Sequence, residues 1–358
     1  MSNNGPVLSR RGFLTRAGAA VLMGVAAPSI LAACAPGGSA APAKSNNTGG
    51  AGNVPTVPFT FLSFLPLTSF TVTPEMLGDL DGTFKKNGLD ITLEPVHGSA
   101  QATQLLLANK GQVARNGLID AMVAAFTQNQ PVVVTGIDTY ATGIRIVTTA
   151  KNPNPSDWAG KTMGVPSVNG TSDKTLSMSL IEAGIDPKSV KRQLVGLSAG
   201  TFDLVKNGTL VGYIVSADTA FLVAKQNPEA RVFTPSTGAG INIYMTTKDQ
   251  VAQNGDALKK YFTAIKEVKS GLVDAPDKAI TTAIDALRSK YSWAALDDVH
   301  IAPDALKAQV ALWKNPSGQI GAPDMDAIEK SYEELVKAGF VPGGKKIEDL
   351  IDTSLLPS

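Results

Sequence analysis

From residue 56 onward, short apolar segments alternate with helix-like segments, and this alternation limits the possible folds more than any other feature. Residues 59–64 are apolar and aromatic, as in a strand, and residues 74–87 carry apolar side chains at helical spacing up to Gly88. Further strands are predicted at 89–96, 112–116 and 132–136, with helices at 99–109 and 118–128. Strands alternating with crossover helices predict a mostly parallel α/β sheet.

The pattern then starts again, which predicts a second α/β unit. Strands are expected at 161–166, 192–197, 210–216 and 231–234, with helices at 171–183, 199–207 and 220–226. Two β-rich segments, 144–150 and 241–247, flank this unit, and we interpret them as two crossings between domains. Four helices follow at 257–271, 276–291, 303–313 and 325–339, and we expect them to pack on the first unit.

These elements predict a chain of two domains, in keeping with its 358 residues. We expect domain one to comprise 56–146 plus 246–358, and domain two to comprise 147–245. Each domain is expected to be a mostly parallel sheet with flanking helices. Closure about the two crossings would bury a ligand between them.

The first 55 residues differ in composition from the rest of the chain. Arg10 and Arg11, followed by Phe13 and Leu14, form a twin-arginine export pattern, and the apolar stretch after them is shorter than the ~20 residues of a membrane span. Residues 31–34, Leu-Ala-Ala-Cys, resemble a bacterial lipobox. We therefore predict a signal at 1–33 that is cleaved before Cys34, and fatty-acyl (palmitate-type) anchoring of Cys34 to the cell membrane. The alternative is a buried free thiol.

Residues 34–55 are rich in Ala, Pro, Gly, Ser and Asn, which is typical of a flexible linker. Together with the signal, this linker predicts a lipid-anchored protein on the extracytoplasmic face of the membrane.

Composition excludes several classes of function. The formal net charge of +1 is no basis for nucleic-acid binding, and one Cys with two His excludes a disulfide within the chain and makes a metal site improbable. P-loop, Gly-x-Ser-x-Gly and His-Glu-x-x-His motifs do not occur after the signal segment. We therefore expect no cofactor, no metal and no enzymatic activity.

Four segments, in order, resemble one protein family. They are Gly-Thr-Phe-Lys-Lys-Asn-Gly-Leu-Asp-Ile at 82–91, Gln-Pro-Val at 130–132, the stretch at 158–166 and the stretch at 205–213. They resemble substrate-binding proteins of ABC importers, in the thiamine-pyrimidine, riboflavin, sulfonate, taurine and nitrate branch of the periplasmic-binding-protein superfamily. The chain departs from the family pattern in two places. Members of the family often have an Asp in the strand at 111–117 and at the position of Gly212, and this chain has no Asp at either.

The resemblance implies a type II two-domain fold and a monomer that delivers a small molecule to an ABC permease with its ATPase subunit. A remote alternative is an enzyme similar to the eukaryotic pyrimidine-synthesising relative. The Cys-rich iron motif of that relative is absent here, since Cys34 is the only cysteine.

Ligands of open α/β sheets bind at the carboxyl ends of strands, so the candidate binding residues lie there. The candidates are Phe64, Ser99, Arg115, Asn116 and Tyr140 in domain one and Thr171, Ser172, Ser198, Tyr213 and Ser216 in domain two. We expect Tyr140 and Tyr213 to supply stacking faces, although each could be a core residue. Thr171 and Ser172 open a helix and could bind a polar group or only cap it.

Arg115 is the only Arg or Lys in these strand-end segments, and it could pair with an anion, stack on a ring or lie exposed. Hydroxyl and aromatic side chains dominate the rest. The sequence therefore favours an uncharged aromatic heterocycle, such as riboflavin or a thiamine-type pyrimidine. The alternative is an alkanesulfonate, taurine or nitrate.

Overall fold

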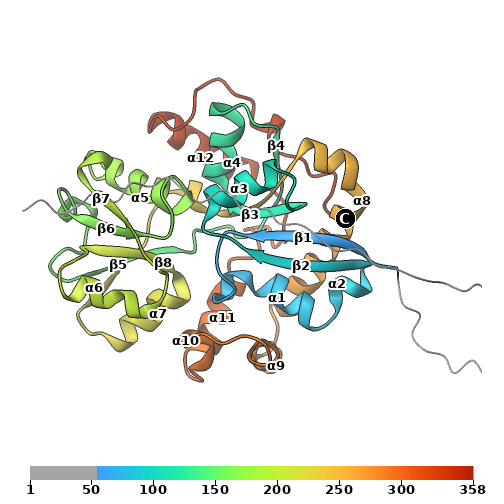
Figure 1. The fold of residues 1–358 in the computed structure, drawn as a ribbon, viewed down its shortest axis with the longest axis horizontal. Helices are drawn as coiled ribbons and strands as arrows, with labels where there is room; N and C mark the ends of the chain where they lie inside the picture. Colours follow the sequence, from blue (N-terminus) through green and yellow to red (C-terminus); the bar gives the residue numbers. More distant parts are fainter. Residues whose placement is uncertain (1–54, 358) are drawn as a thin grey trace, which may run out of the picture. The chain divides into compact units, whose positions relative to one another are not determined.

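The computed structural model describes residues 55–357 (Figure 1). The predicted export signal, Cys34 and nearly all of the predicted linker lie outside these residues. No helix in the part of the chain that the structure describes is long and apolar enough to span a membrane.

Five strands form the first sheet, in the order β2-β1-β3-β10-β4. Their bounds are β1 Val57–Ser63, β2 Leu89–Pro95, β3 Val113–Gly117, β4 Val132–Ile137 and β10 Asn242–Thr247. Strands β1, β2 and β3 pair in parallel, whereas β10 runs antiparallel to β3 and β4. The intervening helices are α1 Thr73–Leu80, α2 Thr83–Lys86, α3 Ser99–Leu107 and α4 Leu118–Met122. The predicted mostly parallel sheet is present.

The second sheet repeats this arrangement in the order β7-β6-β8-β5-β9. Its strands are β5 Ile144–Thr149, β6 Thr162–Val165, β7 Lys191–Leu194, β8 Gly212–Ser216 and β9 Ala230–Phe233. Here β5 is the antiparallel member, between β8 and β9. The helices are α5 Thr171–Glu182, α6 Phe202–Lys206 and α7 Ala217–Gln226. We refer to each sheet with its helices as the first and the second lobe.

The C-terminal helices pack on the first lobe. They are α8 Lys248–Leu272, α9 Asp277–Arg288, α10 Ala294–Asp297, α11 Ala302–Val310 and α12 Met325–Lys337. Their apolar side chains share one core with strand β1, where Phe59 and Tyr261 stack with ring centroids 5.0 Å apart. Burying these apolar faces is what holds a helical segment of this length on the sheet.

The predicted crossings require a correction. Segments 144–150 and 241–247 are not connections, because β5 pairs within the second sheet and β10 within the first. The chain instead passes between the lobes at 138–143 and 234–241, just before each of these strands. Each of these two segments runs antiparallel in its sheet and forms backbone hydrogen bonds there. In a connection between the lobes, the same backbone groups would lack these partners.

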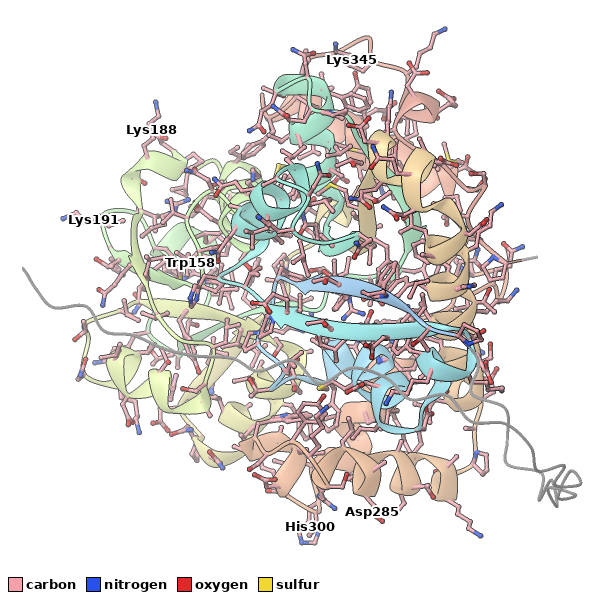
Figure 2. All side chains as sticks on the ribbon, turned by 45° about the vertical axis from the view of Figure 1, so that its right-hand side comes forward. Trp158, Lys188, Lys191, Asp285, His300 and Lys345 are labelled. Carbon is pink, nitrogen blue, oxygen red and sulfur yellow. The ribbon has the colours of Figure 1, made fainter. Side chains whose placement is uncertain are left out.

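The second lobe has its own core, and charged side chains lie outside it. Trp158 is completely buried there and meets Phe233 edge to face, with ring centroids 5.5 Å apart. In Figure 2 the labelled Lys188 of this lobe extends away from the ribbon and is exposed, as are Lys345 and His300 of the first lobe.

Candidate functional site

A cavity of about 380 Å³ lies between the two lobes. The first lobe contributes the chain after β1, including Leu65 and Ser69, and also Trp293. The second lobe contributes Ser198 and the end of β8 at Ser216. A small hollow of about 30 Å³ adjoins it, sharing Leu65, Leu197 and Ser216, and adds Phe64, Thr71, Ser172 and Asn242 to the lining. We call the two together the interlobe cavity.

The interlobe cavity combines apolar walls with hydroxyl groups. Among the described residues that line it, none is a Lys, Arg, His, Asp or Glu. Beside the lining residue Ser69 lies Asp218, whose carboxylate accepts hydrogen bonds from Phe70 N (3.3 Å) and Ser69 Oγ (3.4 Å) across the lobes. Walls of this kind can hold an apolar ring and hydrogen-bond neutral polar groups at its edge.

Trp293 is the large aromatic residue of the cavity that sequence reasoning missed. Its ring meets Phe70 edge to face, with centroids 5.0 Å apart and an interplanar angle of 67°. Its indole Nε1 is buried and has no hydrogen-bond partner among the described residues. Trp293 comes just before α10, far from any strand end, so the strand-end rule could not find it; a Trp in a polar stretch between two helices was the available signal.

Four of the ten predicted residues meet in the interlobe cavity. Phe64 and Ser172 line the small hollow, Ser198 lines the larger part, and Ser216 lines both. They come from both lobes and from the carboxyl ends of their strands, as the topology requires. Their contact with a ligand remains a prediction.

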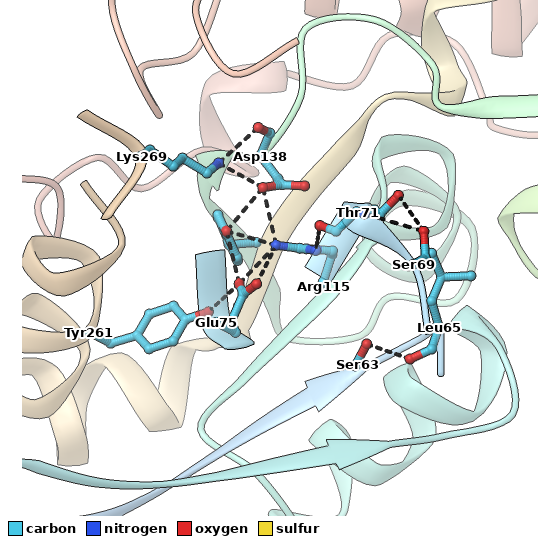
Figure 3. Close-up of polar contacts among 10 residues, drawn as sticks. Ser63, Leu65, Ser69, Thr71, Glu75, Arg115, Asp138, Tyr261 and Lys269 are labelled. Atoms are coloured by element: carbon cyan, nitrogen blue, oxygen red, sulfur yellow. Dashed lines mark hydrogen bonds and ion pairs between the residues drawn. The ribbon is translucent and has the colours of Figure 1, made fainter. Parts of the chain in front are cut away.

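Arg115 does not face the cavity. Its Nη2 lies 2.8 and 2.7 Å from the two carboxylate oxygens of Glu75, and 3.2 Å from Asp138 Oδ1 (Figure 3). Lys269 Nζ donates to the same Asp138 oxygen at 2.7 Å, and the hydroxyl of Tyr261 donates to Glu75 at 2.9 Å. The Arg115 side chain is completely buried. Its predicted role as an anion contact is therefore wrong.

The pKa values in this cluster reflect the competition between burial and charge. Burial raises the pKa of Glu75 above its ordinary value, and the neighbouring Arg115 opposes the rise. Burial likewise lowers the pKa of Lys269, against the attraction of Asp138. Two acids and two bases share the site, so the cluster has no excess charge with which to attract an anion when all four are ionised.

The predicted stacking faces are also wrong. Tyr213 is completely buried in the second lobe, and its hydroxyl donates to Ser198 O at 3.2 Å. Tyr140 is partly buried, and its hydroxyl donates to Ala322 O at 2.5 Å beside α12, in a different pocket. Desolvation by burial raises the pKa of both hydroxyls. Both side chains complete the packing of their own lobes.

Three further candidates make protein contacts instead of lining the cavity. Thr171 N donates to Ser99 Oγ at 2.7 Å, and Thr171 Oγ1 accepts from Gly117 N at 3.1 Å. Asn116 is completely buried, and its Nδ2 donates to Thr103 Oγ1 at 2.8 Å. Ser99 and Thr171 thus join the two lobes directly and leave no space for a ligand between them. As ligand contacts, these three predictions are not supported by the geometry.

The described residues were also compared with the arrangement that a metal site requires. In residues 55–357, no group of three or more His, Cys, Asp and Glu side chains is arranged to hold a metal ion.

Comparison with solved structures defines the fold class. The chain is similar to a Candida albicans protein described as having the generic periplasmic-binding-protein fold (TM-score 0.63, 16% identity, 84% of this chain and 96% of that one). It is also similar to the alkanesulfonate-binding protein SsuA of Xanthomonas axonopodis pv. citri bound to MOPS (TM-score 0.61, 10% identity, 84% and 98%). The nitrate-binding protein NrtA of Synechocystis PCC 6803 gives a TM-score of 0.62 at 14% identity, with 84% and 87% covered. The protein has the two-domain periplasmic-binding-protein fold.

The family follows from the sequence. The profile of the NMT1/THI5-like family matches residues 69–279, from the chain after β1 to the start of α9, and the chain belongs to this family. No curated protein matches the chain significantly.

Proposed function

We propose that the protein is an extracytoplasmic solute-binding protein that captures a small, uncharged aromatic heterocycle and delivers it to an ABC permease. A vitamin or vitamin precursor, such as riboflavin or a thiamine-type pyrimidine, has the required chemistry. The observation that carries the proposal is the lining of the interlobe cavity, where Trp293 and Phe64 accompany hydroxyl groups.

The size and polarity of the cavity support this ligand class. About 380 Å³ falls within the range of small-molecule sites, and an aromatic ring would gain both buried apolar area and contact with Trp293. Ser198 and Ser216 provide hydroxyl groups that can donate to or accept from ring nitrogens and carbonyls.

The alternative ligand is an alkanesulfonate, taurine or nitrate, since the similar SsuA and NrtA are named for alkanesulfonate and nitrate binding. Anion sites usually gather Arg, Lys or several N–H donors around the charge. Here the buried Arg115 and Lys269 are paired with Glu75 and Asp138. This pairing favours the neutral ligand over the anion.

We further propose that the protein is a monomer tethered through acylated Cys34 and that it carries out no chemical reaction on its ligand. The permease and its ATPase subunit would be its partners, and ATP would be hydrolysed there. Ligand capture would proceed by closure of the lobes about segments 138–143 and 234–241.

Calorimetric titration with a panel of compounds tests this function. Riboflavin, a thiamine-type pyrimidine, taurine, an alkanesulfonate and nitrate are each titrated into the folded, unlipidated protein. We expect binding of one of the first two and none of the last three. Binding of an anion alone would replace the proposed ligand class with the alternative.

A further inference from the structure

One side of the boundary between the lobes is sealed by a cluster of direct polar contacts. Thr171, the first residue of α5, donates its hydroxyl hydrogen to Asp120 Oδ2 of the first lobe and accepts a hydrogen bond from Gly117 N. Its backbone N donates to Ser99 Oγ. Lys174, one turn further along α5, lies 2.5 Å from Asp120 Oδ1. We call Ser99, Gly117, Asp120, Thr171 and Lys174 the latch.

The latch leaves no space between the lobes. Asp120, Thr171 and Ser99 are each at most 5% exposed. A Cβ atom added to Gly117 would overlap the Thr171 side chain, and one added to Gly98 would overlap Ser167 of the second lobe. A Cβ on Gly170 would lie only 2.7 Å from Ser99 Oγ. These glycines allow the lobes to approach to backbone contact.

On the other side of the boundary, α7 of the second lobe packs against α10 and α11 of the first lobe. There Asp218 receives hydrogen bonds across the lobes at 3.3 and 3.4 Å, and the interlobe cavity lies beside it. The shorter contacts between the lobes therefore lie at the latch, and most of the space for a ligand lies beside Asp218. Every bond of the latch joins two residues of this chain, so closing the latch requires no ligand.

We propose that Asp120 and Thr171 are positioning residues that hold the lobes together on the latch side and thereby confine the ligand to the Trp293 side of the cleft. The carboxylate of Asp120 carries the contact, because it pairs with the Thr171 hydroxyl and the Lys174 ammonium at the N-terminal end of α5, where negative charge is favoured. This proposal is independent of which ligand the cavity binds.

The experiment measures the distance between the lobes in the unliganded protein. Fluorescent labels are placed at Ala108→Cys and Ala183→Cys, which are exposed at the ends of α3 and α5, in a Cys34→Ser background that removes the only natural cysteine. Energy transfer between them reports the balance of closed and open molecules. No ligand is added, so failure of the proposed ligand class leaves this result unaffected.

Two variants break the latch in different ways. Thr171→Val keeps the shape of the side chain but removes both bonds of Oγ1, whereas Gly117→Ala keeps the polar groups and inserts a methyl group between the lobes. Gly117 has φ of −83°, so alanine fits its backbone there. We expect Thr171→Val to lower the closed-to-open ratio by about 10- to 100-fold, the range for a hydrogen bond to a charged group. Gly117→Ala should also lower the ratio, because its methyl group would overlap the Thr171 side chain.

Two controls distinguish the latch from general stability. Thr171→Ser retains the hydroxyl and should restore the energy transfer of the parent protein. Gly255→Ala lies in α8 with open space around the new methyl group, and should not change it. Melting temperatures confirm that each variant is folded. An unchanged inter-lobe distance in folded Thr171→Val and folded Gly117→Ala would overturn the proposal.

Discussion

Arg115 Nη2 lies 2.7 Å from Glu75 Oε2, and both side chains are completely inaccessible to solvent. The pair joins β3 to α1, and Asp138 and Lys269 extend it to the chain between the lobes and to α8. A cluster of this kind is costly to assemble and still more costly to break, since removing one member leaves another buried charge unpaired. Its position inside the first lobe makes it a structural element of the fold.

Replacing Arg115 by Met should therefore destabilise the protein by about 3–5 kcal/mol, because Glu75 or Asp138 would lose its counter-charge. Urea unfolding measures the change. Lys290→Met is the matched control, since Lys290 pairs with Asp79 at the surface (52% and 24% exposed) and should cost about 1 kcal/mol or less. A stable Arg115→Met protein with lost ligand affinity would restore Arg115 as a binding residue.

The position of Arg115 illustrates which features could not be predicted from the sequence. Alternation of apolar segments located most strands and helices, including β4, expected at 132–136 and found at Val132–Ile137. The same pattern could not show that β5 and β10 run antiparallel within their sheets, since local sequence does not specify a pairing partner. For the same reason it could not pair Arg115 with Glu75.

Part of the candidate site could be predicted from the positions of the strand ends. Phe64 and Ser216 follow or end strands, so the strand-end rule located them. Trp293 enters the cavity from the segment before α10, and only the packing of the C-terminal helices brings it there. Thr171 was expected to bind ligand because it opens a helix, but Asp120 and Ser99 occupy its polar groups.

Trp293 should contribute directly to ligand affinity. Trp293→Ala removes its ring and the apolar area it covers, and we expect a loss of about 1–3 kcal/mol, or roughly 5- to 150-fold in affinity. Trp293→Phe should recover part of this loss. The measurement is calorimetric titration with whichever heterocycle binds the parent protein, with Tyr332→Phe in α12 as a control outside the cavity. Equal affinity in the parent and Trp293→Ala would place the ligand elsewhere.

Salt should have little effect on binding. Ring contacts and neutral hydrogen bonds are not screened by ions, whereas attraction of an anion to surface charge is. Titrations at low and high sodium chloride should give affinities for the heterocycle that differ by less than about threefold. A steep fall in affinity with added salt would point instead to a charged ligand.

The proposed anchor requires Cys34, the only cysteine of the chain. Two or more acyl chains bind a membrane stably, so Cys34→Ala should release the mature protein into the soluble extracytoplasmic fraction. Fractionation followed by immunoblotting measures this. Continued membrane attachment of the variant would refute the lipid anchor.

The central claim is that the interlobe cavity binds an uncharged aromatic heterocycle, and the small molecule that copurifies with the protein tests it most directly. The protein is purified without unfolding, the bound compound is released by heat, and its mass and absorbance spectrum are recorded. Trp293→Ala purified in parallel should carry less of it. We predict a neutral compound that absorbs in the near ultraviolet or visible range and that rebinds at a one-to-one ratio. Recovery of a sulfonate or nitrate that rebinds equally well to the parent and to Trp293→Ala would contradict the account.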